Sequence, residues 1–219
     1  MKPLLSAQNI NKSFQLEDDT INVLKDISLV INEAEFVAIM GKSGSGKSTL
    51  LSILAGLDLP DSGSVNLGDV DLTTLSEDGL ALKRQTDISF VFQSFHLIPT
   101  LTVAENIGFP LKLSGSFSQQ KVDDLLEKVA LTDRKNSFPH QLSGGEKQRT
   151  AIARALITQP KILFADEPTG NLDENNAKSI MQLLIDLQIE FQTALVIVTH
   201  DDAIATTANR TIHIVNGNI

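Results

Sequence analysis

A glycine-rich run that follows a short, wholly apolar segment constrains the fold of this chain more than any other feature. Residues 36–40 (FVAIM) form an uninterrupted apolar run of strand length, which is typical of a central parallel strand buried on both faces. The run from Gly41 to Ser48 (GKSGSGKS) matches the pattern G-x-x-x-x-G-K-[ST], and a helix is expected from Lys47 to about Leu57. Strand, glycine-rich loop and helix together predict a phosphate-binding loop, because backbone N–H groups and a helix N-terminus attract anions.

This loop predicts distinct roles for its residues. Lys47 is expected to reach the β- and γ-phosphates of a nucleotide such as ATP, and the Ser48 hydroxyl is expected to bind Mg²⁺. An ordinary Gly/Ser-rich turn is the alternative, but the strand and helix on either side make that coincidence rare. The residues expected to contact the nucleotide are Gly41, Lys42, Ser43, Gly44, Ser45, Gly46, Lys47, Ser48 and Thr49.

Two further apolar runs predict an α/β fold with a parallel sheet. They are residues 161–165 (KILFA) and 194–198 (ALVIV), and the segment 174–190 between them has the apolar spacing of an amphipathic helix. A strand, a helix and a second strand in this order form a right-handed crossover between parallel strands. Near the N-terminus, residues 4–10 and 21–31 are expected to be half-buried antiparallel strands.

The middle of the chain has few strand signals and is expected to be helical. Apolar residues between Val122 and Val129 predict one helix, and residues 143–157 predict another. We therefore expect a single domain over residues 1–219. Its α/β core, with the antiparallel part, would comprise residues 1–93 and 159–219, and an inserted helical subdomain would comprise residues 94–158.

Two carboxylates end the KILFA strand, where ligands bind in open parallel sheets. Asp166 is placed to hold Mg²⁺, directly or through water, and Glu167 can act as the general base that polarises an attacking water. A strand-end Asp that caps the next turn is the alternative. The upstream phosphate loop favours the catalytic interpretation.

Charge and composition exclude several classes of function. The net charge is −9, which disfavours nucleic acid as a partner because such binding depends on phosphate neutralisation. The chain has no cysteine, so disulfide scaffolds and thiolate metal sites are excluded. No segment approaches the length of a membrane span, and residues 1–14 do not match a signal peptide. At a membrane, another chain would have to do the spanning.

The run Leu142 to Arg149 (LSGGEKQR) points to a second anion site. Ser143 and two glycines stand before an expected helix, whose N-terminus offers N–H groups and a positive dipole end. An ordinary Ser cap is the alternative. The LSGGE run resembles the signature of the ABC ATPases, and the order of the motifs follows that family from end to end. The resemblance implies a head-to-tail homodimer in which Ser143, Gly144 and Gly145 of one copy close on the γ-phosphate held by the other.

The same resemblance assigns the remaining site residues. Gln93 is similar to the glutamine that contacts Mg²⁺ or the attacking water, and His200 to the histidine that contacts the γ-phosphate. Asp173 ends an Asn-Leu-Asp run similar to the loop that links the two active sites. Phe14 resembles the aromatic residue that stacks on adenine, for which a core phenylalanine is the alternative.

Three longer runs resemble one bacterial branch, the MacB/LolD/YbbA-like ATPases, and YbbA-like chains most of all. They are residues 56–58, 90–107 and 164–173, and the polar stretch 17–22 agrees with them. This resemblance implies an ATP- and Mg²⁺-dependent subunit at the cytoplasmic face of the inner membrane, which powers an integral membrane permease. The expected cargo is lipoprotein, peptide or another hydrophobic molecule. Residues 94–113 are the candidate contact with the permease, and internal packing is the alternative.

Three other functions stay open at this point. A soluble ABC ATPase that acts on DNA or ribosomes usually carries a coiled coil, zinc cysteines or tandem ATPase units, and none of these is evident here. A regulatory module that binds nucleotide without hydrolysis would not need Glu167 and His200. A nucleotide kinase or GTPase has no use for an LSGGE run.

Overall fold

A computed structural model describes residues 2–16 and 19–219 of the chain. Residues 17 and 18, which belong to the polar stretch predicted from the sequence, lie outside this description. In chain order the described part begins with strands β1 (Pro3–Leu16), β2 (Asp19–Asn32) and β3 (Phe36–Met40) and helix α1 (Lys47–Leu54). Strands β4 (Ser62–Leu67) and β5 (Val70–Asp71) follow, then a 3-10 turn (Leu72–Thr74), helix α2 (Glu77–Thr86) and strand β6 (Ile88–Phe92).

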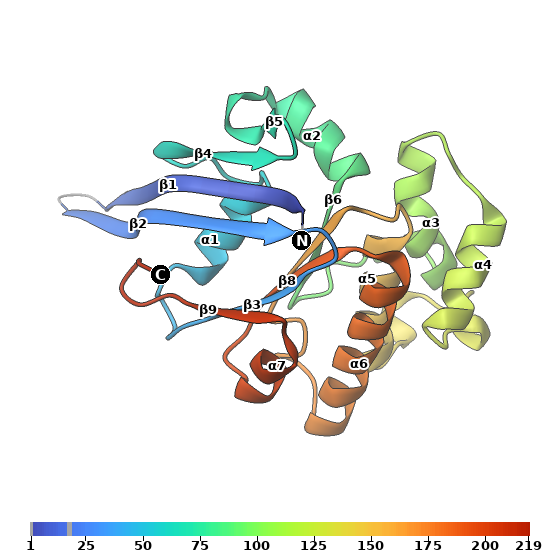
Figure 1. Ribbon diagram of the computed structural model, residues 1–219. Helices are drawn as coiled ribbons and strands as arrows, with labels where there is room; N and C mark the ends of the chain where they lie inside the picture. The colour runs from blue at the N-terminus through green and yellow to red at the C-terminus, as the bar shows by residue number, and fades with distance from the viewer. Residues whose placement is uncertain (1, 17–18) are drawn as a thin grey trace.

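A parallel sheet with the strand order β6-β7-β8-β3-β9 forms the centre of the molecule (Figure 1). Strand β7 (Ile162–Asp166), helix α6 (Glu174–Phe191) and strand β8 (Ala194–Val198) form the predicted crossover, and β7 and β8 are parallel neighbours. Helix α7 (Asp202–Thr207) then leads to the edge strand β9 (Arg210–His213). The phosphate loop follows β3, and the carboxylates follow β7, so both lie at the carboxyl edge of one sheet.

A second sheet, with the order β2-β1-β4-β5, is antiparallel. Strands β1 and β2 are longer than the sequence predicts. The two strands pair irregularly between Ile10 and Lys12, so the alternation of buried and exposed side chains is interrupted there. Asp26 lies opposite this irregularity and has a φ of 52°. The nearest buried residues of β2 are Leu24 before Asp26 and Ile27 after it, an odd spacing that a regular strand would not give. A bulge of this kind interrupts the period-two alternation on which strand prediction depends.

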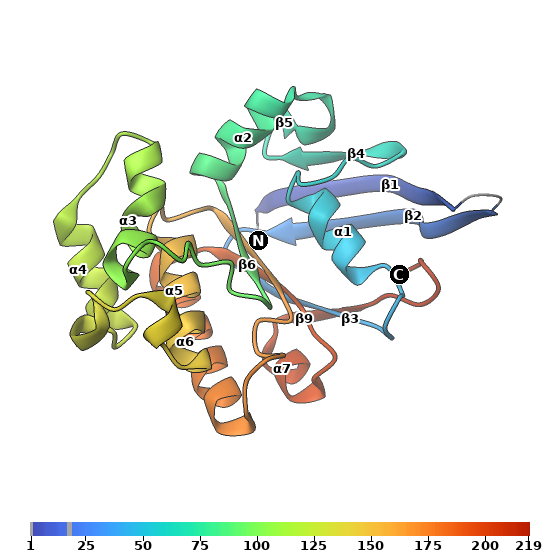
Figure 2. The same ribbon diagram turned by 180° about the vertical axis from the view of Figure 1, so that it is seen from behind.

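The segment between β6 and β7 contains α3 (Val103–Leu113), α4 (Gln119–Lys128) and α5 (Gly144–Leu156), with 3-10 turns at Thr132–Arg134 and Pro139–Gln141. Figure 2 shows this helical segment to one side of the parallel sheet, away from the antiparallel sheet. Helix α3 begins with a capping box, in which Thr102 and Glu105 satisfy each other's backbone N–H groups.

Two apolar layers hold these parts together. On one face of the parallel sheet, α1 packs between it and the antiparallel sheet around residues such as Phe164 and Leu50. On the other face, Leu163 and Ile197 pack against helices α3 to α6. Both faces of β3, β7 and β8 are covered in this way, as their uninterrupted apolar sequences predict. Within the described residues, no helix is long and apolar enough to cross a membrane.

Candidate nucleotide site

The phosphate loop connects β3 to α1 in a conformation that only glycine fits at one position. Gly46, the residue before α1, has a φ of 100°, and a Cβ there would lie 2.9 Å from the Leu24 side chain and from the Val23 carbonyl oxygen. The β2 strand therefore packs directly against the loop. Within the loop, Lys47 Nζ donates to the carbonyl oxygens of Gly41 at 2.9 Å and of Lys42 at 3.0 Å. The buried ammonium is thus held where the loop curves around an anion.

A cleft of about 640 Å³ opens beside this loop at the edge of the parallel sheet. It brings together most of the nucleotide and catalytic residues predicted from the sequence, although these come from four separate segments. The lining residues are Val23, Gly41, Lys42, Ser43, Gly44, Gly46, Lys47, Ser48, Thr49, Gln93, Asp166, Glu167 and His200. Val23 was not predicted as a site residue, because its place in an apolar strand gives no functional signal.

Asp166 faces the first turn of α1 across the cleft. Its Oδ1 accepts a hydrogen bond from Ser48 Oγ at 3.3 Å. Burial raises the pKa of Asp166, and the neighbouring Glu167 carboxylate raises it further, while the Ser48 hydrogen bond and Lys47 oppose the rise. The carboxylate therefore sits where a cation would stabilise its charged form.

Glu167 is held in an unusual backbone conformation. Its φ is 44°, in the left-handed region that residues with a Cβ rarely adopt. The backbone N–H donates to Val198 O at 3.0 Å, and its carbonyl accepts from Gly170 N at 3.0 Å, so bonds on both sides fix the residue. Strained backbone of this kind is concentrated at functional sites. The Glu167 side chain meets His200, whose Nδ1 lies 3.2 Å from Oε1.

Gln93 follows β6 directly and is paired with Asn171. Its Nε2 lies 3.3 Å from Asn171 Oδ1, and Asn171 Nδ2 donates to the Gln93 carbonyl at 2.9 Å. A Cβ on Gly170 would lie 2.8 Å from Gln93 Nε2, so this glycine leaves room for the amide. The partner Asn171 belongs to the Asn-Leu-Asp run, yet its contact with Gln93 could not be foreseen from sequence.

The signature residues do not line this cleft. Ser143 caps α5 in a capping box with Glu146: Ser143 N donates to Glu146 Oε2 at 2.8 Å, and Glu146 N donates to Ser143 Oγ at 3.3 Å. These bonds with Ser143 lower the pKa of Glu146. Gly144 and Gly145 form the first turn, where a Cβ would lie 3.2 Å from the Leu172 side chain and 3.0 Å from Asn176 Oδ1, respectively. The N–H groups of this turn are those expected to bind an anion.

Three other predicted residues also lie outside the cleft. Asp173 caps α6 by accepting from Asn176 N at 3.0 Å, and this bonding lowers the pKa of Asp173. Ser45 lines an adjoining cavity of about 560 Å³. Phe14 is 43% exposed on β1, which makes a core role unsuitable, and its cross-strand partner Ile21 lines that same adjoining cavity. Its contact with adenine stays a prediction.

Comparison with known proteins agrees with this geometry. The ABC transporter family profile matches residues 24–170. The chain is 44% identical over 219 residues to the lipoprotein-releasing system ATP-binding protein LolD of Legionella pneumophila, covering 99% of this chain and 96% of that protein. It is 47% identical over 215 residues to the macrolide export ATP-binding/permease protein MacB of Bdellovibrio bacteriovorus, covering 98% of this chain. That match covers 33% of MacB, so this chain spans about a third of that relative.

The fold has a solved counterpart in the ATP-binding cassette MJ0796, seen as a dimer in a post-hydrolysis state bound to ADP and Pi. The TM-score is 0.90 at 40% identity, covering 98% of this chain and 96% of that one. This chain belongs to the ABC transporter family and is an ATP-binding cassette with ATPase activity. Within the family it falls in the predicted MacB/LolD-like branch. The predicted fold class is thereby confirmed, while the narrower YbbA-like assignment stays a prediction.

Proposed function

We propose that this chain powers a separate integral membrane permease from the cytoplasmic face of a bacterial inner membrane. The observation that carries the proposal is the cleft in which Lys47, Ser48, Asp166, Glu167 and His200 converge. It contains a group for each requirement of Mg·ATP hydrolysis, namely phosphate binding, metal binding and activation of water. The similarity to LolD, the ATP-binding protein of a lipoprotein-releasing system, supports a role in a transporter.

The chemistry of the cleft fits Mg²⁺. Ser48 Oγ and Asp166 Oδ1 lie 3.3 Å apart, and both are the hard oxygen ligands that Mg²⁺ prefers. Gln93 adds an amide to the same cleft. Mg²⁺ commonly uses only one or two protein ligands beside phosphate oxygens and water, so this small set is sufficient. The bound ion would neutralise phosphate charge during transfer.

The side chains of the cleft divide the hydrolytic work. Lys47 binds phosphate oxygens together with the N–H groups of the loop, and Glu167 accepts a proton from the attacking water. His200, 3.2 Å from Glu167 Oε1, orients that carboxylate and can reach the terminal phosphate. Gln93 completes the wall of the cleft that would face the attacking water and the metal ion. These roles follow from the contacts of each side chain and from the chemistry that the reaction requires.

We further propose that a second copy of the chain completes each site. Ser143, Gly144 and Gly145 present an anion-binding helix terminus that lies outside the chain's own cleft. A head-to-tail arrangement would place this terminus over the γ-phosphate bound by the partner copy. The dimeric MJ0796 structure supports such an assembly. ATP would then favour the closed dimer, because it binds that state with more contacts than the open one.

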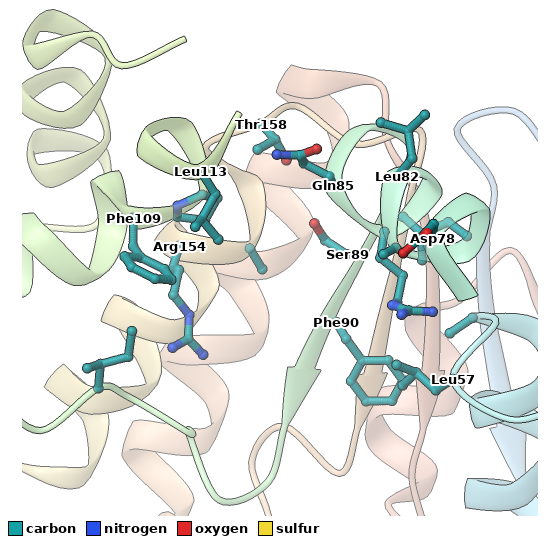
Figure 3. Close-up of a pocket in the computed structure, with 17 residues that line it drawn as sticks. Leu57, Asp78, Leu82, Gln85, Ser89, Phe90, Phe109, Leu113, Arg154 and Thr158 are labelled. Carbon is teal, nitrogen blue, oxygen red and sulfur yellow. The ribbon is translucent and has the colours of Figure 1, made fainter. Parts of the chain in front are cut away.

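The permease would dock in a second hollow, a groove of about 750 Å³ between α2 and β6 on one side and α3 and α5 on the other. Figure 3 shows Leu82 and Phe90 facing Phe109 and Leu113 across it. Leu82 is 58% exposed and Leu113 is 65% exposed, which is unusual for apolar residues that meet only water. The predicted contact segment 94–113 thus has two roles, since Val103 and Ile107 are buried inside while Phe109 and Leu113 line the groove.

The cargo follows from relatives alone. Two of the relatives are named for macrolide export and for lipoprotein release. We propose export or extraction of a lipoprotein, a peptide or a hydrophobic molecule from the inner membrane. ATPase motifs do not determine cargo, so the permease would have to select it.

Tagged protein recovered from detergent-solubilised native membranes tests the proposed function. Wild-type chain should retain an integral membrane protein in stoichiometric amount. A charge in the groove, Leu113→Asp, should abolish this recovery, whereas Ile189→Asp on the distant helix α6 should not, although Ile189 is also 57% exposed. Recovery of soluble partners alone by the wild-type chain would instead indicate a soluble ABC ATPase and would contradict the permease.

A further inference from the structure

The loop after Gln93 has a backbone that needs external support. Phe95 and His96 are consecutive residues with positive φ, at 59° and 47°, and neither is a glycine. Such conformations persist only where surrounding contacts hold them. Within the loop, His96 N donates to Ser94 O at 2.6 Å, and the His96 ring meets the Phe92 ring at 4.7 Å. These local contacts tighten the turn, but they do not attach it to the rest of the molecule.

Arg154 on α5 supplies that attachment. Its Nη1 donates to the His96 carbonyl at 2.6 Å, and its Nη2 donates to the Phe95 carbonyl at 3.0 Å. Two donors on one rigid plane thus bind the two strained peptide groups together. Lysine cannot reproduce this fork, because its ammonium is a single point charge on a flexible stem.

The charge of Arg154 is not used for pairing with a carboxylate. In the part of the chain that the structure describes, Arg154 makes no ion pair. Burial lowers the pKa of its guanidinium, yet both terminal nitrogens bond only to the loop carbonyls. A partly desolvated cation without an anionic partner carries a cost that a purely structural residue would avoid.

Arg154 also lines the groove between α2 and α3. Figure 3 shows it beside Phe109, on the wall opposite Leu82 and Phe90. One side chain therefore contacts both the groove and the loop that follows Gln93. Gln93 itself lies two residues before Phe95 and lines the ATP cleft.

We infer that Arg154 is a positioning residue that sets the place of Gln93 in the ATP cleft by holding the two strained residues that follow it. The inference rests on the proposed hydrolytic role of Gln93.

Arg154→Lys tests this inference, and the chain provides a matched control. Arg210 on the edge strand β9 also donates to a carbonyl, that of Val30, but it lies outside the groove and does not reach the Gln93 loop. We expect Arg154→Lys to lower kcat roughly 10- to 100-fold with KM for ATP nearly unchanged, because a misplaced catalytic group costs rate rather than affinity. Arg210→Lys should leave both constants near those of the wild type. Equal loss in the two variants would contradict the inference.

Two further measurements separate positioning from general damage. The loss of kcat in Arg154→Lys should not add to the loss in Gln93→Ala. If Arg154 acts through Gln93, the double variant should be no slower than Gln93→Ala alone. Full additivity would overturn the inference. Hydrogen exchange gives a readout that needs no ATPase activity, and the amides of Phe95 and His96 should exchange faster in Arg154→Lys but not in Arg210→Lys. Unchanged exchange would show that Arg154 does not hold Phe95 and His96 in place, and would contradict the inference. Absent ATPase activity in the wild type would contradict only the proposed function.

Discussion

His200 Nδ1 lies 3.2 Å from Glu167 Oε1, so two residues from the ends of neighbouring strands β7 and β8 meet at the mouth of the ATP cleft. The His200 side chain is 72% exposed, while that of Glu167 is 28% exposed. The histidine is therefore free to reach a bound phosphate while it fixes the carboxylate. This pairing gives Glu167 a defined orientation for its proposed role as general base.

Glu167→Gln should bind ATP normally and lose nearly all turnover. An amide keeps the shape of the carboxylate but cannot accept the proton of water, and loss of a general base costs about 10²- to 10⁴-fold in rate. Steady-state phosphate release and fluorescent nucleotide titration measure the two effects separately. Glu174→Gln, which alters an exposed carboxylate on α6, is the control. Normal turnover in Glu167→Gln would show that the base lies elsewhere.

Lys47→Ala should lose nucleotide affinity while keeping the fold. Hydrogen bonds from a charged group are worth about 1.5–3 kcal/mol, so we expect Kd for ATP to rise roughly 10- to 150-fold. Titration with a fluorescent ATP analogue measures this directly. Lys121→Ala on the exposed face of α4 removes the same charge at a distance and should leave Kd unchanged. Equal affinities for all three proteins would contradict the phosphate-binding role.

Asp166→Asn should stabilise the nucleotide-free protein while impairing hydrolysis. Burial raises the pKa of Asp166 above its ordinary value of 3.8, so the folded state holds its proton more tightly than the unfolded chain does. The wild type therefore loses stability as the pH rises from that value through the raised pKa, and the loss is complete above it. The amide of the variant cannot ionise, so the variant escapes this loss.

At neutral pH, the gain in the free energy of unfolding of Asp166→Asn should stay below about 1 kcal/mol, because partial exposure screens the charge. Urea unfolding without nucleotide or Mg²⁺, followed from acid to neutral pH, measures the difference between the two proteins. This difference in the free energy of unfolding should vanish at the most acidic pH. Asp69→Asn, which alters an exposed carboxylate, is the control. A stability advantage for Asp166→Asn that grows toward acid pH would contradict the assignment.

Phe164→Ala should destabilise the whole domain. Phe164 in β7 is fully buried between the parallel sheet and α1, and the centroid of its ring lies 6.4 Å from that of the Phe90 ring. Truncation of a buried phenylalanine costs about 3–5 kcal/mol. Phe117 is 46% exposed, and the same truncation there should cost under about 1 kcal/mol. Urea denaturation of both variants checks the contrast, and similar midpoints would contradict the packing.

The sequence predicts the central strands well because burial on both faces leaves an unmistakable apolar run. β3 and β8 begin and end where those runs do. Helix α2 escapes prediction, since Leu80 is its only fully buried residue among those described and no apolar stripe forms. The edge strand β9 is equally hidden, because Ile212 alone is buried in it. Marginal elements of this kind depend on tertiary contacts that local sequence does not record.

The candidate site shows the same division. Lys47, Asp166 and Glu167 could be predicted, because their motifs are local and each stands beside a buried strand. The pairing of Gln93 with Asn171 joins residues far apart in the chain, and so does the clamp of Arg154 on Phe95 and His96. No local pattern carries such contacts. Residues whose role depends on a second copy, such as Ser143, can be recognised by resemblance, but the phosphate that they are expected to contact is bound by the other copy.

The central claim, that ATP joins two copies head to tail, is tested most directly by sedimentation of Glu167→Gln with and without Mg·ATP. We predict monomers without nucleotide and stable dimers with it. Adding Ser143→Asp should abolish the dimer, because aspartate caps a helix as well as serine does but repels the γ-phosphate. The matched change Ser118→Asp, at the cap of α4, should leave the dimer intact. Dimers of Glu167→Gln that form without ATP, or that survive Ser143→Asp, would contradict the account.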